Sequence, residues 1–378
     1  MKFIHLSDLH LGKRVNEFSM LEEQEAILEQ ILDIVDSEKP DGIFIAGDIY
    51  DKSIPPAEAV SLFDKFIAKI AKRKTETFII SGNHDSPERI AFGSSVMNES
   101  GIHFSPVYDG NVKPFCIKDE HGEVFVYMLP FVKPTHVRRY FENEEIVTYT
   151  DAVRVAVNAM NIDTSKRNVL ITHQFVTGAS VCGDEEVSVG GTDNVNADVF
   201  KDFDYVALGH IHGAQNCGSE KIRYCGTPLK YSLSEVNHAK SVTVVEMGQK
   251  GEFEVRTIPL TPIHDMSEVK GTFAELTDPS YYVGKNFKDH YLRIILTDEN
   301  DVPEALGRLR NVYKNIMRLE YDNTRTRTDN LIVGTADAET KSAFELFGEF
   351  YFKQNNVEMS QEQKEYIREL IEKIEEEK

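Results

Sequence analysis

Short apolar runs alternate with amphipathic segments from residue 1 to about residue 261, and this alternation limits the possible folds more than any other feature. The runs at 2–6, 42–46, 77–81, 168–172 and 205–208 are almost continuously hydrophobic. Runs of that length and character are typical of strands buried on both faces, as in a sheet covered by helices. The chain is therefore predicted to be an α/β protein.

Two amphipathic helices are predicted between the first three strands. Ser19 and Glu22 have the spacing of a capping box, so the first helix is expected to begin there and to end at Pro40. The second is expected to follow Pro55 and Pro56.

The remainder of the chain differs in texture. Residues 218–259 contain short alternating runs separated by Gly and Pro, which predict antiparallel strands. Strands at 291–297 and 317–321 with a helix at 303–313 predict a small α/β cap domain. Two amphipathic helices follow at 342–352 and 360–377, the second with a capping box at Ser360 and Gln363. They are expected to dock on helices of a partner or to pack on the cap. The predicted domains are 1–261, 262–340 and 341–378.

Residue types that bind metals follow each of the five buried strands. They are Asp8 and His10, Asp48, Asn83, His173, and His210 and His212, in the order of the strands. One such motif arises easily by chance. In open α/β sheets, however, ligands bind at the carboxyl ends of the strands. Five motifs at five strand ends, on one edge of one sheet, therefore predict a single metal site.

The ligand types indicate both the metal and the reaction. Imidazole and carboxylate together favour manganese, iron or zinc over magnesium or calcium. Seven side chains are too many for one tetrahedral site but are enough for two ions if a carboxylate bridges them, and Asp48 is the expected bridge. Two ions ~3.5–4 Å apart can activate a hydroxide and stabilise phosphate oxygens. Hydrolysis of a phosphoester is the predicted reaction.

Other residues beside the predicted ligands are assigned supporting roles. His84 is predicted to be a catalyst that donates to the leaving oxygen rather than a ligand. Asp85 is expected to orient His84, with capping of the next helix as the alternative. Asp51 is equally compatible with a place behind the ligands and with a helix N-terminus. Three glycines precede ligands, where the backbone must approach the metals closely: Gly47, Gly82 and Gly209.

The charge balance raises a question about the substrate. The chain has 63 acidic and 42 basic residues, a net charge of −21, whereas nucleic-acid binders usually carry a basic surface. Either metals and a partner supply positive charge, or the substrate is not nucleic acid. The chain shows neither a signal peptide nor an apolar stretch long enough to span a membrane, so a cytoplasmic location is expected. The four cysteines form no CxxC pair and are expected to be reduced: Cys116, Cys182, Cys217 and Cys225.

The ligand pattern resembles that of the calcineurin-like metallophosphoesterase superfamily. Within it, four longer strings resemble the SbcD family of nuclease subunits: GDIYDKSIPPAEAVSLFDKF, SGNHDSPERIAFGS, VGGTDNVNADVF and YCGTPLKYSLSE. The resemblance implies a two-sheet sandwich flanked by helices. It also implies that one metal is held by Asp8, His10, Asp48 and His212, and the other by Asp48, Asn83, His173 and His210. His84 would be catalytic.

The same resemblance implies an activity and a partner. Members of the SbcD family use Mn²⁺, degrade double-stranded DNA ends as exonucleases, and cut single strands and hairpins as endonucleases. This activity would serve DNA repair, recombination and replication. Residues 262–340 would then be a capping and DNA-binding domain. An SbcC-type coiled-coil ATPase would dock on residues 341–378, and two nuclease chains would form a homodimer within a heterotetramer.

Two other classes of function are alternatives to the nuclease. A phosphatase or a small-molecule or nucleotide phosphodiesterase of the same superfamily is the nearest alternative. Protein phosphatases, however, carry GDxVDRG and GNHE, whereas here Lys52 and Ser53 follow Asp51, and Asp85 follows His84. An inactive scaffold of this fold would be expected to lack ligands, and none is missing.

Overall fold

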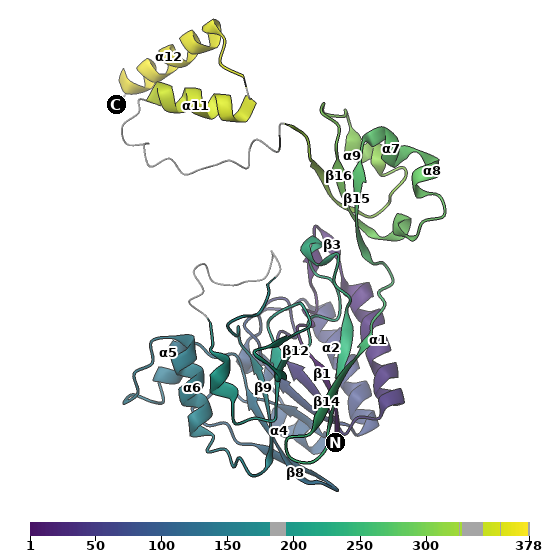
Figure 1. Cartoon of the computed structure of the whole chain (residues 1–378), viewed down its shortest axis with the longest axis vertical. Coiled ribbons are helices and arrows are strands. Elements are labelled where there is room, and N and C mark those ends of the chain that lie inside the picture. Colours follow the sequence, from purple (N-terminus) through teal and green to yellow (C-terminus); the bar gives the residue numbers. More distant parts are fainter. Residues whose placement is uncertain (182–193, 325, 327–342, 356, 377–378) are drawn as a thin grey trace. The chain divides into compact units, whose positions relative to one another are not determined.

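The computed structural model describes residues 1–181, 194–324, 326, 343–355 and 357–376. The chain divides into two units, Met1–Asp265 and Met266–Lys378, both drawn in Figure 1. Parts of the sequence predictions lie outside the described residues: Cys182, residues 189–193 of one family string, residues 327–340 of the predicted cap, and residues 341–342 and 377–378 of the tail segment. The division into three domains remains a prediction.

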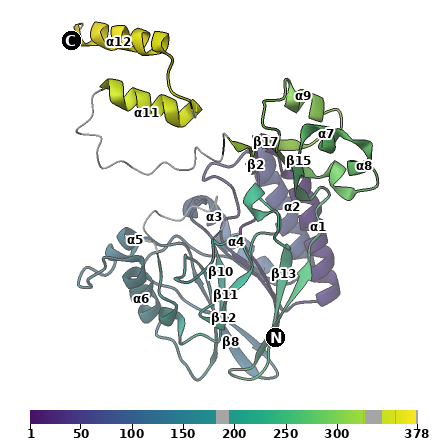
Figure 2. The ribbon, with the colours of Figure 1, turned by 45° about the horizontal axis from the view of Figure 1, so that its top comes forward.

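The first unit is built on two six-stranded sheets. In spatial order, the first sheet consists of β14 (Phe253–Pro259), β13 (Ser241–Met247), β1 (Lys2–Leu6), β4 (Gly42–Ala46), β5 (Glu76–Ile80) and β6 (Ile102–Phe104). The second consists of β11 (Gln215–Cys217), β12 (Ser219–Tyr224), β10 (Tyr205–Gly209), β9 (Arg167–His173), β8 (Gly122–Leu129) and β7 (Phe115–Asp119). Figure 2 shows β8, β10, β11 and β12 of this second sheet together.

The core between the sheets joins side chains from both of them. Phe44 and Phe78 of the first sheet share one buried cluster with Val126, Ile171 and Ala207 of the second. This packing confirms the two-sheet sandwich. The prediction that all five ligand-bearing strands lie in one sheet is wrong, because β1, β4 and β5 belong to the first sheet and β9 and β10 to the second. A strand is apolar on both faces whether it lies between two helix layers or between a helix layer and a second sheet. The sequence pattern therefore did not distinguish one sheet from two.

The strands of residues 218–259 are antiparallel only in part. β13 pairs antiparallel with both β1 and β14, as predicted. β12 pairs antiparallel with β11 but parallel with β10. The alternation of apolar residues reports the pleat of a strand, which is the same in both pairings, and not the direction of its neighbour.

Helices cover the outer faces of the sandwich. α1 (Leu21–Glu38) and α2 (Ala57–Arg73) lie on the side of the first sheet in Figure 1. α5 (Pro134–Arg138) and α6 (Tyr149–Ala159) cover the second sheet, since Val137 and Val153 share a buried cluster with Leu170 and Val206. The short helices α3 (Pro87–Ile90) and α4 (Ser94–Met97) follow β5.

The capping box predicted for the first helix is wrong, whereas the start of the second is confirmed. Ser19 ends the two-stranded ribbon of β2 (Arg14–Val15) and β3 (Phe18–Ser19), where it pairs with Arg14. The N-cap of α1 is instead Met20, which makes no side-chain capping bond. Ser19 thus belongs to the hairpin and not to the helix cap that the local pattern predicted. α2 begins directly after Pro56.

The second unit contains a small parallel sheet and short helices. The sheet has the order β15 (Met266–Gly271), β16 (Tyr291–Leu296) and β17 (Ile316–Tyr321). α7 (Phe273–Thr277), α8 (Pro279–Tyr282) and α9 (Ala305–Leu309) accompany it. Leu276, Leu292, Leu309 and Tyr313 belong to its buried core. The helix predicted at 303–313 is shorter because Glu304, with φ of 53°, lies in the left-handed region.

Two longer helices end the described chain, α11 (Ala343–Asn355) and α12 (Gln361–Glu376). The predicted capping box of α12 is confirmed: Gln363 N donates to Ser360 Oγ at 3.3 Å, and Ser360 N donates to Gln363 Oε1 at 2.8 Å. Among the helices that the structure describes, none has the length and apolar character of a membrane span. The three described cysteines are free thiols, as predicted.

Candidate metal centre

The carboxyl end of β9 and the loops that follow β1, β4, β5 and β10 bring the seven predicted ligands together. The backbone N of His210 lies 3.1 Å from both carboxylate oxygens of Asp8. Ligand atoms of Asp8, His10 and His212 lie within 4.8 Å of one another, as do those of Asp8, Asp48 and His173. The predicted meeting of five strand ends is therefore real, although two facing sheets supply them.

Asp48 lies at the middle of this group. Its Oδ2 is 3.2 Å from Nε2 of His173, 3.8 Å from Nε2 of His10 and 3.9 Å from Nε2 of His84. Its Oδ1 accepts a hydrogen bond from the backbone N of His84 at 2.9 Å. A carboxylate with imidazoles on several sides is the arrangement expected of a ligand shared by two ions.

Asn83 joins the remaining two imidazoles. Its Oδ1 lies 2.9 Å from Nε2 of His173 and 2.9 Å from Nδ1 of His210. Nδ1 of His173 lies 2.8 Å from the carbonyl oxygen of Ala46, to which it donates. That hydrogen bond fixes the tautomer and leaves Nε2 to face Asn83 and Asp48.

Four of the predicted ligands have a left-handed backbone. The φ angles are 53° at Asp8, 43° at His10, 49° at Asp48 and 103° at His210. Non-glycine residues seldom adopt this region, at a cost of about 1–3 kcal/mol each. Strain of this kind persists where the surrounding structure enforces it, and it clusters at functional sites.

The glycines beside the ligands leave no room for a side chain. A Cβ on Gly82 would lie 2.0 Å from Oδ1 of Asp48, and a Cβ on Gly47 would lie 2.5 Å from Nδ1 of His173. On Gly209 it would lie 2.0 Å from the carbonyl oxygen of Ala46. The predicted close approach of backbone to this site is confirmed at all three positions.

His10 shows that the site fits a divalent metal. Its side chain is 1% exposed, and neither ring nitrogen has a hydrogen-bond partner among the described residues. Buried polar atoms are nearly always satisfied, so two unsatisfied nitrogens indicate a missing partner. Burial lowers the pKa of His10 well below its usual range. The neutral imidazole that results is the form that binds metals.

Protonation in the centre follows from burial and from neighbouring charges. Burial also lowers the pKa of His210, to about 3. For Asp48, burial opposes ionisation, but His173 and its hydrogen bond hold the pKa of the carboxyl below its usual range. Burial likewise disfavours the charged form of His173, yet Asp48 raises its pKa to about 9. The neutral imidazoles of His10 and His210 together with the carboxylate of Asp48 form a mixed nitrogen and oxygen donor set, which suits first-row transition metals.

His84 lies at the edge of the centre, with a side chain 20% exposed. Its Nδ1 lies 3.0 Å from the carbonyl oxygen of Asp51. The Oδ1 atom of Asp51 lies 2.8 Å from Nζ of Lys13 and 3.8 Å from Nδ1 of His10. α2 begins only at Ala57. Of the two roles left open for Asp51, a place behind the ligands therefore applies.

The contacts of Asp85 differ from the prediction. Its carboxylate accepts hydrogen bonds from the backbone N atoms of Ile49, Tyr50 and Gly82, at 3.1, 3.0 and 2.9 Å. It therefore ties the loop after β4 to the loop after β5, and the orienting contact of His84 comes from Asp51. Burial, with Asp48 nearby, raises the pKa of Asp85 to about 6. An aspartate shortly before a helix can accept hydrogen bonds from neighbouring loops as readily as from a neighbouring histidine ring. The sequence pattern is the same in both cases, so it did not distinguish them.

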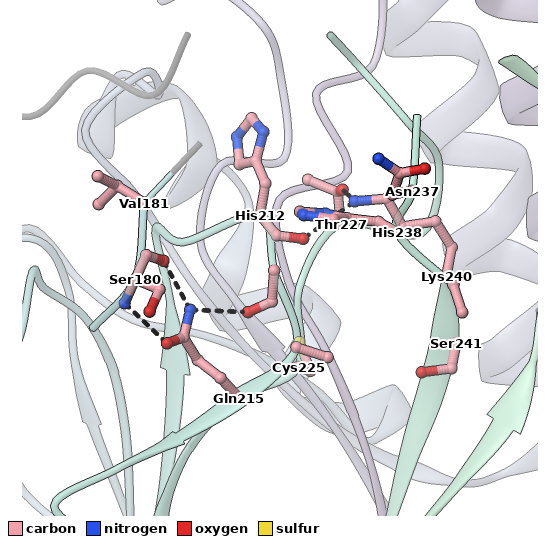
Figure 3. Close-up of a pocket in the computed structure, with 13 residues that line it drawn as sticks. Ser180, Val181, His212, Gln215, Cys225, Thr227, Asn237, His238, Lys240 and Ser241 are labelled. Atoms are coloured by element: carbon pink, nitrogen blue, oxygen red, sulfur yellow. Dashed lines mark hydrogen bonds between the residues drawn. The ribbon is translucent and has the colours of Figure 1, made fainter. Parts of the chain in front are cut away.

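One buried carboxylate at this site, Glu235, was not among the predicted residues. Glu235, 0% exposed, accepts a hydrogen bond from Nδ1 of His212 at 3.0 Å. Its position at the end of the string YCGTPLKYSLSE was the available signal. Beside His212 lies a pocket of about 490 Å³ whose lining includes Thr227, His238 and Lys240 (Figure 3).

Comparison with known proteins identifies the family. A protein-family model described as calcineurin-like phosphoesterase matches residues 1–214. A second, described as type 5 capsule protein repressor C-terminal domain, matches residues 262–355. The chain belongs to the calcineurin-like phosphoesterase family, a class of metal-dependent hydrolases.

A curated relative narrows this assignment. The SbcD subunit of the nuclease SbcCD from Staphylococcus epidermidis is 30% identical over 378 residues, with 98% of each chain covered. Likeness over nearly the whole of both chains groups this one with the SbcD subunits, which confirms the resemblance seen in the sequence strings.

Two solved structures are also similar. TT1561 of Thermus thermophilus is 13% identical and a dimetal phosphatase from Danio rerio is 11% identical, each with a TM-score of 0.39. They cover 68% and 69% of this chain, and 98% and 99% of their own. A TM-score at this level supports no inference about the chain.

Proposed function

We propose that this chain is the nuclease subunit of a complex with an SbcC-type ATPase, in which it hydrolyses phosphodiester bonds of DNA with two divalent ions. It would act as an exonuclease on double-stranded ends and as an endonuclease on single strands and hairpins, in repair and recombination. One observation carries the proposal. Seven ligand-type side chains converge in a chain that aligns over 98% of its length with a nuclease subunit.

The proposed ligands form two sets that share Asp48. Asp8, His10 and His212 would complete one site, and Asn83, His173 and His210 the other. Two divalent ions in such a centre supply Lewis-acid activation of water and stabilise charge on the phosphoryl oxygens. The mixed nitrogen and oxygen donors support Mn²⁺ as the metal.

His84 is the proposed catalytic residue. With Nδ1 on the carbonyl oxygen of Asp51, its Nε2 lies toward Asp48, at 3.9 Å from Oδ2. In its protonated form the ring can donate a hydrogen bond or a proton to the leaving oxygen. Its partial exposure supports contact with a substrate. Asp85 would act indirectly, by joining the two loops that carry Asp48 and His84.

The C-terminal helices are the proposed docking site for the ATPase. Phe350 is 59% exposed, Phe352 49% and Tyr366 65%. Exposed aromatic side chains at this density mark a surface that binds a partner. In the proposed division, residues 1–261 form the nuclease domain, 262–340 the DNA-binding cap and 341–378 the docking segment.

A second exposed apolar surface supports the proposed homodimer. Phe92 is 84% exposed, Val96 73% and Val60 44%. Phe92 and Val60 line a pocket of about 500 Å³ between α2 and the segment that contains α3 and α4. A second copy of the chain that covered this surface would bury apolar groups that otherwise face water.

A cleavage assay tests the activity. The chain is incubated with Mn²⁺ and linear duplex DNA, hairpin DNA or the generic diester bis(p-nitrophenyl) phosphate, each with and without the ATPase. We expect cleavage of DNA ends and hairpins, enhanced by the ATPase. Efficient cleavage of the generic diester alone would instead support a small-molecule phosphodiesterase, and no cleavage of any substrate would support a scaffold.

The variant His84→Ala tests the catalytic role within the same assay. It should keep both metal ions, measured by elemental analysis, and lose turnover, because His84 is proposed to act on the leaving group and not as a ligand. Turnover near the rate of the unaltered protein would contradict that role.

A further inference from the structure

Glu235 occupies a position that neither matched family description covers. It ends the 3₁₀ turn η3 (Leu233–Glu235), between the segments 1–214 and 262–355 that the two family models match. The intervening segment thus contributes a fully buried carboxylate that touches His212. Burial of a charged carboxylate costs free energy unless the carboxylate is paired and hydrogen-bonded.

Lys240 supplies the partner and also holds His212 directly. Its ε-ammonium, on a residue 8% exposed, forms an ion pair with Oε2 of Glu235. The same group donates to the backbone oxygen of His212 at 3.0 Å and to Oγ1 of Thr227 at 2.6 Å. The backbone N of Thr227 donates to that His212 oxygen as well, at 3.2 Å. Figure 3 shows His212, Thr227 and Lys240 around one pocket.

These contacts hold His212 at both its ends. Lys240 and Thr227 hold the main chain, and Glu235 holds the imidazole. Since Glu235 accepts the proton on Nδ1, the lone pair of the neutral ring lies on Nε2. A ring nitrogen of His212 lies within 4.8 Å of ligand atoms of Asp8 and His10, and Nε2 is the nitrogen that Glu235 leaves available to a metal. A carboxylate behind a ligating imidazole fixes its orientation and raises its basicity.

We propose that Glu235, held by Lys240 and Thr227, is a positioning residue that sets His212 for one of the two metal ions. The inference rests on the proposed function, in which His212 is a ligand. Glu235 touches the ligand and not the substrate, so its loss should weaken one ion selectively. The set of Asn83, His173 and His210 should be unaffected.

Titration of the full-length chain with Mn²⁺ tests this inference, with free Mn²⁺ measured by electron paramagnetic resonance. Glu235→Ala should weaken the binding of one ion about 10–100-fold, the usual effect of removing a partner behind a metal ligand, and leave the second ion unchanged. Equal weakening of both ions, or of neither, would overturn the proposal.

A double-mutant cycle separates this proposal from the assignment of His212. If Glu235 acts through His212, its removal from a His212→Ala chain should cause no further loss of affinity. Additive losses would overturn the positioning role. If His212→Ala alone retained both ions at full affinity, the ligand assignment itself would fail, which is a different result from a weak effect of Glu235→Ala alone.

Glu23→Ala is the matched control for general destabilisation. Glu23 is also buried, at 1% exposed, and its Oε1 lies 2.7 Å from Nδ1 of His264. Within the described part of the chain it makes no hydrogen bond to a predicted ligand, so Mn²⁺ affinity should stay unchanged. A loss equal to that of Glu235→Ala would overturn the proposal.

Glu235→Gln covers the case in which the alanine variant does not fold. It keeps the volume and an oxygen for the His212 N–H but loses the charge. Its Mn²⁺ affinity at the affected site should lie between those of the unaltered protein and His212→Ala. Affinity equal to that of the unaltered protein would overturn the role of the charged carboxylate.

Discussion

Gly209→Ala probes a point where the two sheets approach each other closely. Gly209 ends β10 of the second sheet, and a Cβ there would lie 2.0 Å from the carbonyl oxygen of Ala46, which ends β4 of the first. The same Cβ would lie 2.7 Å from Nδ1 of His173. Gly209 is not in the left-handed region, so the substitution tests contact alone and not backbone conformation.

The magnitude follows from the two contacts. Overpacking of a well-packed site costs about 1–3 kcal/mol. Separation of His173 from Ala46, now 2.8 Å apart, leaves buried hydrogen-bonding groups unsatisfied at a cost of about 1–3 kcal/mol. The free energy of unfolding should therefore fall by about 2–6 kcal/mol. A displacement of about 1 Å in His173 should lower diester hydrolysis on the order of 100-fold.

Urea unfolding followed by circular dichroism measures the first quantity, and Mn²⁺-dependent hydrolysis of bis(p-nitrophenyl) phosphate the second. Gly307→Ala is the matched control, because Gly307 lies within α9 and a Cβ there meets no atom within 4 Å. Alanine in a helix is favoured by about 0.5–1 kcal/mol over glycine, so this variant should be as stable as the unaltered protein or more so. Equal stability and activity in both variants would refute the reasoning.

Three further predictions concern the metals, acid stability and the partner. Asp48→Asn should remove both ions, and elemental analysis showing two retained ions would refute the bridge. Asp119 pairs with buried Arg167. The hydrogen bond from Arg167 holds the pKa of the Asp119 carboxyl below its usual range, although burial acts to raise it. Asp119→Asn should therefore cost about 2 kcal/mol at pH 7. The difference in urea unfolding should shrink as pH falls below about 4, because the stabilisation is lost as the native carboxylate is protonated. Removal of residues 342–378 should abolish co-purification with the ATPase but retain cleavage of simple substrates; retained binding would contradict the docking site.

The strands of the first unit were predictable because their apolar runs are nearly uninterrupted. The runs at 2–6 and 42–46 agree with β1 and β4 residue for residue. The assignment of these strands to two sheets could not be predicted from local sequence, because it depends on packing between residues far apart in the chain, such as Phe44 and Ile171 of one buried cluster. The two-sheet sandwich was predicted from the family resemblance. The hydrophobic pattern alone predicted only that the strands are buried.

The ligands were also predictable from local sequence, whereas the rest of the site was not. A strand end is recognisable from sequence, and a polar residue there is recognisable as a ligand type. The left-handed backbone at Asp8 and Asp48 depends on the loop that each one enters. Glu235 lies on the turn η3, away from the five strand ends at which ligands were predicted, and reaches His212 only in the folded chain. The string YCGTPLKYSLSE places Glu235 in a family motif, but it does not show which ligand the carboxylate contacts.

The net charge of −21 does not exclude DNA as the substrate once the site is considered by itself. Charges on distant surfaces are screened over a Debye length of about 8–10 Å at physiological ionic strength. Within the centre, the proposed ligands contribute two carboxylates, Asp8 and Asp48, against four positive charges on two divalent ions. The local charge is then positive where a phosphate would bind, and a phosphodiester is attracted there, while only acidic groups within about a Debye length of the DNA repel it. The isolated chain should therefore bind DNA weakly but cut it, and a partner with a basic surface should increase affinity far more than the rate of the chemical step.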